Sequence, residues 1–203
     1  MKKALVSVAT AGLLLAAGCH ISVNKNGDGK EKNVKIDTPL GGLHVRSDNT
    51  SAADVGLPVY PGAKLAPDHD GDKSADVHMG FGDFQLRVKV VNYETTDPQD
   101  KVLDFYQKAM GRYGDVIRCQ GSQSVGTPTV TKEGLNCSED HGNAHIQISD
   151  HDNWGGLTLK AGSRHHQHIL GIKSGSGGPG TRFALIELQL PAAIDKDSSK
   201  ASE

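Results

Sequence analysis

Histidine is the residue type in this chain that is best suited to chemistry. The sequence has ten histidines, and the following six fall in one short region: His141, His145, His151, His165, His166 and His168. Neutral imidazole is the commonest protein ligand for transition metals. His166 and His168 would point to the same face of a strand. We therefore expect a candidate site for zinc, copper or nickel, with these ligands: His141, His145, His165, His166 and His168, and Asp150 as an alternative donor.

The alternative interpretation is that these histidines are solvated loop residues. Gly142, Gly155 and Gly162 lie among them, and glycines are typical of turns. The spacing matches no established metal signature, including the His-Glu-x-x-His motif. Both interpretations stay open. The sequence predicts no cofactor other than one of these three metals.

Cysteine is the second candidate for chemistry. Cys119 and Cys137 lie in short apolar–polar runs, and the turn-rich residues 121–134 separate them. If the two runs are facing strands, their α-carbons come within disulfide range, and the closed loop stabilises the fold by about 3 kcal/mol. The alternatives are two buried free thiols or a nucleophilic Cys–His pair, although no local motif marks either cysteine as a nucleophile. We expect the disulfide.

Several catalytic and ligand motifs are incomplete. Lys35 and Met79 stand where two potential calcium loops require their last, bidentate ligand. Residues 175–180 fit the Gly-x-Gly-x-x-Gly pattern, but a strand is expected after them where a nucleotide site needs a helix. No nucleophile elbow occurs, and no motif places a carboxylate pair for acid–base work. We therefore expect no catalytic residue and no enzyme.

The elements that must position these residues are clearest between residues 76 and 114. Apolar and polar residues alternate over residues 84–90, which predicts a strand with one solvated face. Val77, Met79 and Phe81 predict a partner strand joined to it by Gly82-Asp83. The segments 34–37 and 43–46 alternate in the same way and predict a second hairpin.

One amphipathic helix is expected after the long strand. Asp97 suits its N-cap, Pro98 its first position and Gly114 its C-terminal cap. Its apolar stripe has helical spacing: Val102, Phe105, Tyr106, Ala109, Met110 and Tyr113. Beyond it, short apolar runs bounded by glycines predict strands. The expected fold class is α+β, a mostly antiparallel sheet with one packed amphipathic helix.

Composition limits the classes of partner. The formal net charge is −2, so there is no basic surplus to neutralise phosphates. Aromatic residues are 4% of the chain, which argues against a stacking platform for bases or sugars. We expect no nucleic-acid partner.

The amino terminus has the organisation of an export signal. Lys2 and Lys3 precede the apolar residues 4–17, which are too few to span a bilayer because a spanning helix needs about 20 residues. The segment Leu15-Ala16-Ala17-Gly18-Cys19 resembles the lipobox of bacterial lipoprotein precursors. This resemblance implies export, cleavage before Cys19 and lipidation of Cys19. The alternative is an ordinary cleaved signal with a coincidental cysteine.

The same resemblance implies a location in the cell envelope. The partner there is a membrane, contacted through the lipid on Cys19. His20 stands where inner-membrane lipoproteins of enteric bacteria often carry aspartate, which favours an outer membrane, facing the periplasm. Lipidation also removes the odd cysteine, and leaves Cys119 and Cys137 to pair in an oxidising compartment.

A second resemblance covers residues 57–115. The segment Pro58-Val59-Tyr60-Pro61-Gly62-Ala63 is followed by Thr96-Asp97-Pro98, Phe105-Tyr106-Gln107-Lys108 and Tyr113-Gly114. This combination is similar to a module of uncharacterised bacterial envelope proteins. The module has no assigned activity, so the resemblance implies a small α+β fold and transfers no catalytic residue.

The predicted organisation has five parts: a signal peptide at 1–18, a flexible tether at 19–33, a short hairpin and linker at 34–56, an α+β domain at 57–191 and a disordered tail at 192–203. The first expectation for function is a lipid-anchored envelope protein with a non-catalytic binding or structural role. Its partner is an unidentified envelope protein or ligand. A metal-binding envelope protein is the alternative, and a hydrolase the third. The sequence predicts no oligomeric state.

Overall fold

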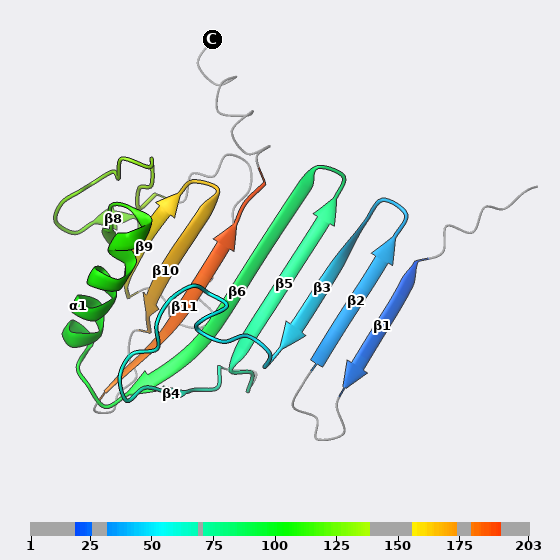
Figure 1. Cartoon of the computed structure of the whole chain (residues 1–203), viewed down its shortest axis with the longest axis horizontal. Helices are drawn as coiled ribbons and strands as arrows, with labels where there is room; N and C mark the ends of the chain where they lie inside the picture. Colours follow the sequence, from blue (N-terminus) through cyan, green and yellow to red (C-terminus); the bar gives the residue numbers. More distant parts are fainter. Residues whose placement is uncertain (1–18, 26–31, 69–70, 139–155, 174–179, 192–203) are drawn as a thin grey trace, which may run out of the picture.

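A computed structural model describes residues 19–25, 32–68, 71–138, 156–173 and 180–191 of the chain (Figure 1). In these residues an 11-stranded antiparallel sheet has the order β1-β2-β3-β5-β6-β11-β10-β9-β7-β8, and β4 pairs with β6. Its strands are β1 (His20–Lys25), β2 (Lys32–Thr38), β3 (Gly41–Ser47), β4 (Lys64–Leu65), β5 (Ser74–Phe81), β6 (Phe84–Thr95), β7 (Ile117–Gln120), β8 (Gln123–Ser124), β9 (Leu157–Ser163), β10 (His166–Ile172) and β11 (Thr181–Gln189). One helix, α1 (Gln99–Met110), packs on the sheet. The predicted fold class is confirmed.

Both predicted hairpins are present. β2 and β3 pair across the turn at Pro39-Leu40, and β5 and β6 pair across Gly82-Asp83. β3 then pairs with β5, so the sheet continues across the predicted boundary at residue 57. The segments on either side of that boundary belong to one sheet.

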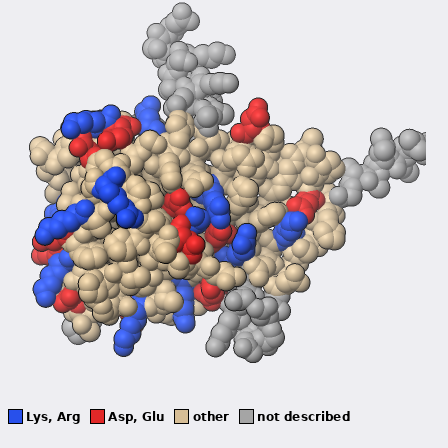
Figure 2. Space-filling model, in the orientation of Figure 1, with Lys and Arg blue, Asp and Glu red and all other residues tan. Residues whose placement is uncertain are grey.

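Strand alternation gives the first half of the sheet two chemically different faces. One face is apolar, as in the cross-strand pairs Ile21–Ile36, Val34–Val45 and Val77–Val88. The other face carries the polar pairs Lys35–His44, Arg46–Asp76 and His78–Arg87. Figure 2 shows acidic and basic side chains next to each other over the middle of this polar face. The polar face is the one that carries α1 further along the sheet (Figure 1).

The main core lies between α1, the segment that precedes β4, and strands β6, β9, β10 and β11. Phe183 stands at its centre, with ring contacts to Tyr60, Tyr93 and Tyr106. Val102, Leu103, Tyr106 and Met110 are the buried residues of the helix. Fully burying each large apolar side chain contributes about 1.5–3 kcal/mol, so α1 is held by packing.

The ends of the helix differ from the prediction by a few residues. α1 begins at Gln99 with Pro98 as N-cap, and no side chain caps it. Asp97 is not the cap because its carboxylate accepts hydrogen bonds from Tyr60 and Lys101. The helix ends at Met110, and a 3₁₀ turn, η1 (Gly111–Tyr113), follows. Gly114 ends this turn with a φ of 121°, a conformation that favours glycine.

The amino-terminal segment also differs from the prediction. A tether is expected over residues 19–33, but His20–Lys25 form β1 and pair with β2. The physical reason is the alternation of Ile21 and Val23 with polar neighbours, which matches Ile36 and Val34 across the pair. Residues 1–18, 26–31 and 192–203, with the predicted signal and tail, lie outside the described residues. No described helix is long and apolar enough to cross a membrane.

The disulfide between Cys119 and Cys137 is present, with the α-carbons 5.5 Å apart. Cys119 lies on β7, but Cys137 lies in the irregular segment after β8. The expectation of two facing strands is therefore wrong, because β7 pairs with β8 and β9 instead. The bridge holds this irregular segment against β7, near the edge of the sheet.

Candidate functional site

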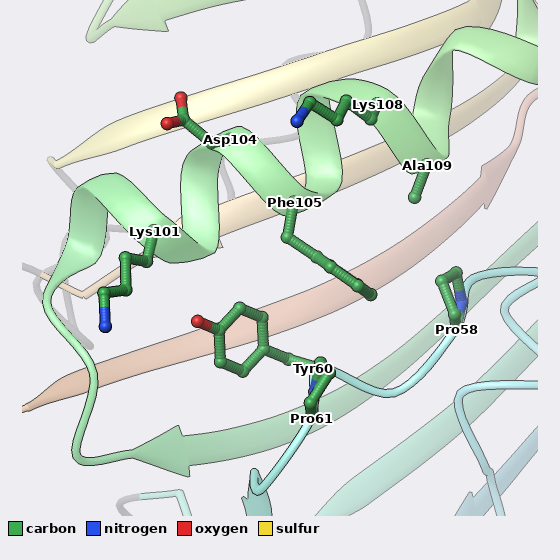
Figure 3. A pocket seen from close by; sticks show the side chains of 8 residues that line it. All are labelled: Pro58, Tyr60, Pro61, Lys101, Asp104, Phe105, Lys108 and Ala109. Carbon is green, nitrogen blue, oxygen red and sulfur yellow. The ribbon is translucent and has the colours of Figure 1, made fainter.

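A groove lies between α1 and the loop that precedes β4. Figure 3 shows the rings of Tyr60 and Phe105 extending toward each other between the loop and the helix. The volume of the groove is about 640 Å³. Its lining comes from the two halves of the predicted module: Pro58, Tyr60, Pro61, Lys101, Asp104, Phe105, Lys108 and Ala109. Volumes of roughly 300–1,000 Å³ are typical of sites for small molecules or peptide segments.

The helix contributes residues at helical spacing. Lys101, Phe105 and Lys108 follow one another at intervals of four and three positions, so they lie on one side of α1. The loop contributes prolines, which restrict its backbone to an extended path. The walls are therefore stiff and apolar, and the charged groups lie on the helix.

Three contacts hold the loop against the helix. The Tyr106 hydroxyl donates a 3.0 Å hydrogen bond to the carbonyl oxygen of Pro58. The Tyr60 hydroxyl donates a 2.8 Å hydrogen bond to Oδ2 of Asp97. The rings of Tyr60 and Phe105 meet edge to face, with centroids 5.2 Å apart. These contacts form the groove before any ligand arrives.

Burial keeps both tyrosine hydroxyls protonated. Burial, and then the hydrogen bond to Asp97, raise the pKa of Tyr60. Burial also raises the pKa of Tyr106. The hydrogen bond from Tyr60, followed by the one from Lys101, lowers the pKa of Asp97. The groove therefore keeps these hydrogen bonds over the whole physiological pH range.

Charge in the groove is unevenly compensated. Nζ of Lys101 lies 3.1 Å from Oδ1 of Asp97, so this cation already has a partner. Within the described part of the chain, Lys108 and Asp104 form no ion pair. The lining contains no histidine, cysteine or serine. The aromatic rings and the unpaired Lys108 suit the binding of an apolar group that carries an anion.

A second polar cluster contains two of the predicted histidines. His166 and His168 point to the same face of β10, as predicted, with ring centroids 5.1 Å apart. Nε2 of His166 donates a 2.8 Å hydrogen bond to Oε1 of Glu187. Nδ1 of His168 donates a 2.9 Å hydrogen bond to the carbonyl oxygen of Val55. His165 lies in the turn between β9 and β10.

Metal binding is a hypothesis that these contacts leave untested. The described residues contain no group of three or more metal-type ligands. The predicted ligands His141 and His145, together with His151 and Asp150, lie outside the described residues. The described part of the candidate site is therefore the pair His166 and His168.

Glu187 is the centre of this polar cluster, although the sequence did not single it out. Its carboxylate accepts a 2.6 Å hydrogen bond from Lys89 and a 3.0 Å hydrogen bond from Gln189, besides the one from His166. Burial alone would raise the pKa of Glu187, but these hydrogen bonds outweigh it and lower the pKa to about 2. Lys89 also donates to the carbonyl oxygen of Asp54. The network therefore fastens the residue 54–56 backbone to the sheet.

His168 lies in a tight contact with the same backbone. Its ring stacks on Tyr113, with centroids 3.6 Å apart. The Tyr113 hydroxyl and the Arg112 guanidinium both donate to the carbonyl oxygen of Gly56. Gly56 has a φ of 77°, which favours glycine, and a β-carbon there would lie 2.7 Å from the Tyr113 oxygen, so a larger residue would be strained. Burial lowers the pKa of His168 and outweighs the hydrogen bond to Val55, which acts the other way.

Sequence reasoning missed both the groove and the role of Glu187. The groove residues lie partly in the loop motif at 58–63 and partly on the predicted helix, and no local pattern brings the two together, while Glu187 lies inside an apolar run. Its position in the strand was the available signal, because Glu187 lies at two-residue spacing from Phe183 and Leu185 and so shares their core-facing side. Comparison with family models, curated proteins and solved structures finds no match to this chain.

Proposed function

We propose that this protein is a lipid-anchored, non-catalytic binding protein of the bacterial cell envelope, and that the groove is its ligand site. The observation that supports binding is the preformed groove of about 640 Å³, with two prolines and two aromatic rings in its lining. The anchor and the location rest on the resemblance of residues 15–19 to a lipobox.

The chemistry of the groove favours an amphiphilic anion. An apolar group would pack against Tyr60 and Phe105, whose ring faces and edges are suited to a second aromatic or aliphatic partner. An anionic group would pair with Lys108, whose charge has no partner in the described structure, while Lys101 is already paired with Asp97. A lipid-like carboxylate and an apolar peptide segment with an acidic residue share this chemistry.

Anilinonaphthalene sulfonate is a suitable probe because it combines aromatic rings with an anion. It would be titrated into the chain beginning at residue 19 with Cys19→Ser, with amide NMR shifts as the readout. We expect saturable shifts in residues 58–63 and 101–109. Lys108→Glu should weaken binding about tenfold, and Asp104→Asn should strengthen it.

Lys132→Glu is the matched control because this exposed lysine lies outside the groove. It should leave the affinity unchanged. Equal affinities for the Lys108→Glu, Asp104→Asn and Lys132→Glu proteins would contradict the groove as the ligand site.

The anchor has a separate test. Mass spectrometry of the membrane-bound protein should find an amino-terminal peptide that begins at Cys19 and carries acyl chains. A Cys19→Ala protein should lack this modification and leave the membrane fraction. An unmodified Cys19 peptide from the native protein would disprove the anchor and leave the groove hypothesis intact.

Metal binding is the second candidate function, and one observation favours it. Metal-ligating histidines usually donate their other ring N–H to a carboxylate or a backbone carbonyl. His166 donates to Glu187 and His168 to Val55, so each ring keeps its second nitrogen as an acceptor. Calorimetric titration with zinc, copper and nickel tests this function. The hypothesis fails if no metal binds more tightly than about 10 µM, or if His166→Ala and His168→Ala do not change the affinity.

A further inference from the structure

Three chain segments lie at the same end of the strands in the first half of the sheet. The register pairs His20 with Asp37, at the start of β1, and Thr38 with Gly41, at the β2–β3 turn. Gly41 is paired in turn with Phe81, at the β5–β6 turn. The start of β1 and the two turns therefore lie at the same end of these strands, the upper end in Figure 1.

Large apolar side chains are exposed at this end. Leu40 is 84% exposed at the β2–β3 turn, Phe81 is 45% exposed at the β5–β6 turn and Ile21 is 63% exposed on β1. Turns are usually built from small or polar residues, and exposed leucine at a turn contributes nothing to the core. Because Ile21 and Phe81 alternate in register with the apolar face, these side chains continue that face to the end of the sheet.

The acceptor for the proposed lipid lies at this same end. Cys19 is exposed and immediately precedes His20, the first residue of β1. Consecutive α-carbons are about 3.8 Å apart, so no length of flexible chain separates a lipid on Cys19 from the sheet. Adjacent strands are about 4.8 Å apart, which places the Phe81 turn only about 15 Å across the sheet from β1.

The charge near Cys19 is compensated. Asp37, the cross-strand partner of His20, accepts from Lys35 at 2.9 Å and from His44 at 3.2 Å. The β2–β3 turn itself consists of Pro39 and Leu40. Contact of this turn with lipid therefore desolvates no unpaired carboxylate of β2.

We propose that this end of the sheet docks on the bilayer surface, with Leu40 and Phe81 inserted among the lipid chains. The inference rests on the proposed lipidation of Cys19 and names the second contact between the protein and its membrane. The sheet then stands on the membrane by its turns, instead of moving freely at the end of a tether.

Tryptophan fluorescence of the full, lipidated protein tests this contact. In a Trp154→Phe background, Leu40→Trp and Phe81→Trp each place the only tryptophan at a turn. Leu65→Trp is the control, because Leu65 is 49% exposed and pairs with Tyr93 at the opposite end of β6. The proteins are reconstituted in phosphatidylethanolamine–phosphatidylglycerol vesicles, with and without bromine on the acyl chains.

We expect brominated lipid to reduce the fluorescence of the two turn tryptophans at least about twofold, because bromine quenches only at contact distance within the hydrocarbon. The fluorescence of the Leu65→Trp protein should not change. Equal quenching at all three positions, or none at the turns, overturns the proposal. A blue-shifted but unquenched turn tryptophan also overturns it and indicates a second protein copy at this surface. Acylation is verified by mass spectrometry beforehand, so failure of docking is distinguishable from failure of the anchor.

Discussion

His168 and Tyr113 form a stacked pair, with ring centroids 3.6 Å apart and planes 21° from parallel. The pair joins β10 to the 3₁₀ turn that follows α1. Nδ1 of His168 also donates to Val55, so the same ring fixes the segment that leads into the groove loop. The groove loop thus depends on a histidine that does not line the groove.

This contact predicts a dependence of stability on pH. Because burial lowers the pKa of His168 below its ordinary value of 6.5, the unfolded chain takes up the proton first as the pH falls. The stabilisation is complete above pH 6.5 and is lost as the pH falls toward the folded-state pKa, by at most about 1.4 kcal/mol per pH unit. In urea unfolding, His168→Phe, which retains a ring, should lose less free energy of unfolding between about pH 7.5 and about pH 5 than the native protein does. If the free energy of unfolding depends on pH in the same way in the native and His168→Phe proteins, His168 is not the group responsible.

Glu187→Gln should destabilise the fold by about 3 kcal/mol, because it removes the carboxylate that balances the charge of the largely buried ammonium group of Lys89 and leaves it only the Asp54 carbonyl oxygen. The double variant Glu187→Gln/Lys89→Met should recover part of that loss. Glu94→Gln, which removes only an exposed partner of Arg182, is the control and should cost less than about 1 kcal/mol. Equal losses for Glu187→Gln and Glu94→Gln in denaturant unfolding would contradict a buried network.

Protonation of Glu187 should lower the stability of the protein at a lower pH than protonation of His168 does. The folded-state pKa of Glu187 is lowered to about 2, from an ordinary value of 4.5. The contribution of Glu187 to the free energy of unfolding is therefore present above pH 4.5 and is lost as the pH falls toward 2. Thermal unfolding of the native protein should show a steeper decline over this range than that of the Glu187→Gln/Lys89→Met variant. Parallel declines would show that another carboxylate is responsible.

Replacing Cys119 and Cys137 by serine should lower the free energy of unfolding by about 3 kcal/mol, the loop-closure value for a sequence separation of 18. Reduction of the native protein should have a similar effect. Cys19→Ser is the control, because Cys19 is free and exposed. A reduced protein as stable as the oxidised one would contradict a structural role for this bridge.

Tyr106→Phe should destabilise the protein by about 1–2 kcal/mol, because the carbonyl of Pro58 loses its buried donor. The same change should weaken binding of anilinonaphthalene sulfonate, since the loop is no longer fixed to α1. Tyr60→Phe should cost less, because Asp97 keeps its hydrogen bond from Lys101. If Tyr106→Phe leaves both stability and binding unchanged, this hydrogen bond does not form the groove.

Local sequence patterns predicted the elements whose partners are close in the chain. The β5–β6 hairpin followed from uninterrupted alternation on both sides of Gly82-Asp83, and α1 from its apolar stripe. The cap at Asp97 was wrong, because Tyr60 takes this carboxylate through a contact that spans 37 positions. β1 was missed since Ile21 and Val23 form a convincing strand only beside Val34 and Ile36.

The candidate site was less predictable for the same reason. Strand periodicity placed His166 and His168 on one face, but the partners of these rings, Glu187 and Val55, come from distant segments. The groove exists only when Tyr106 reaches Pro58 across 48 positions. Spacing predicts which residues share a face, whereas the fold decides which faces meet.

The position of β11 affects the order in which the sheet is completed. β11 is the last strand in the described residues, yet it lies between β6 and β10 in the middle of the sheet. Because a chain is made from its amino terminus, the backbone groups of β6 that pair with β11 stay unpaired until residues 181–189 are available. The β6–β11 and β10–β11 pairs in the middle of the sheet can therefore form only after the strands on both sides of them are present.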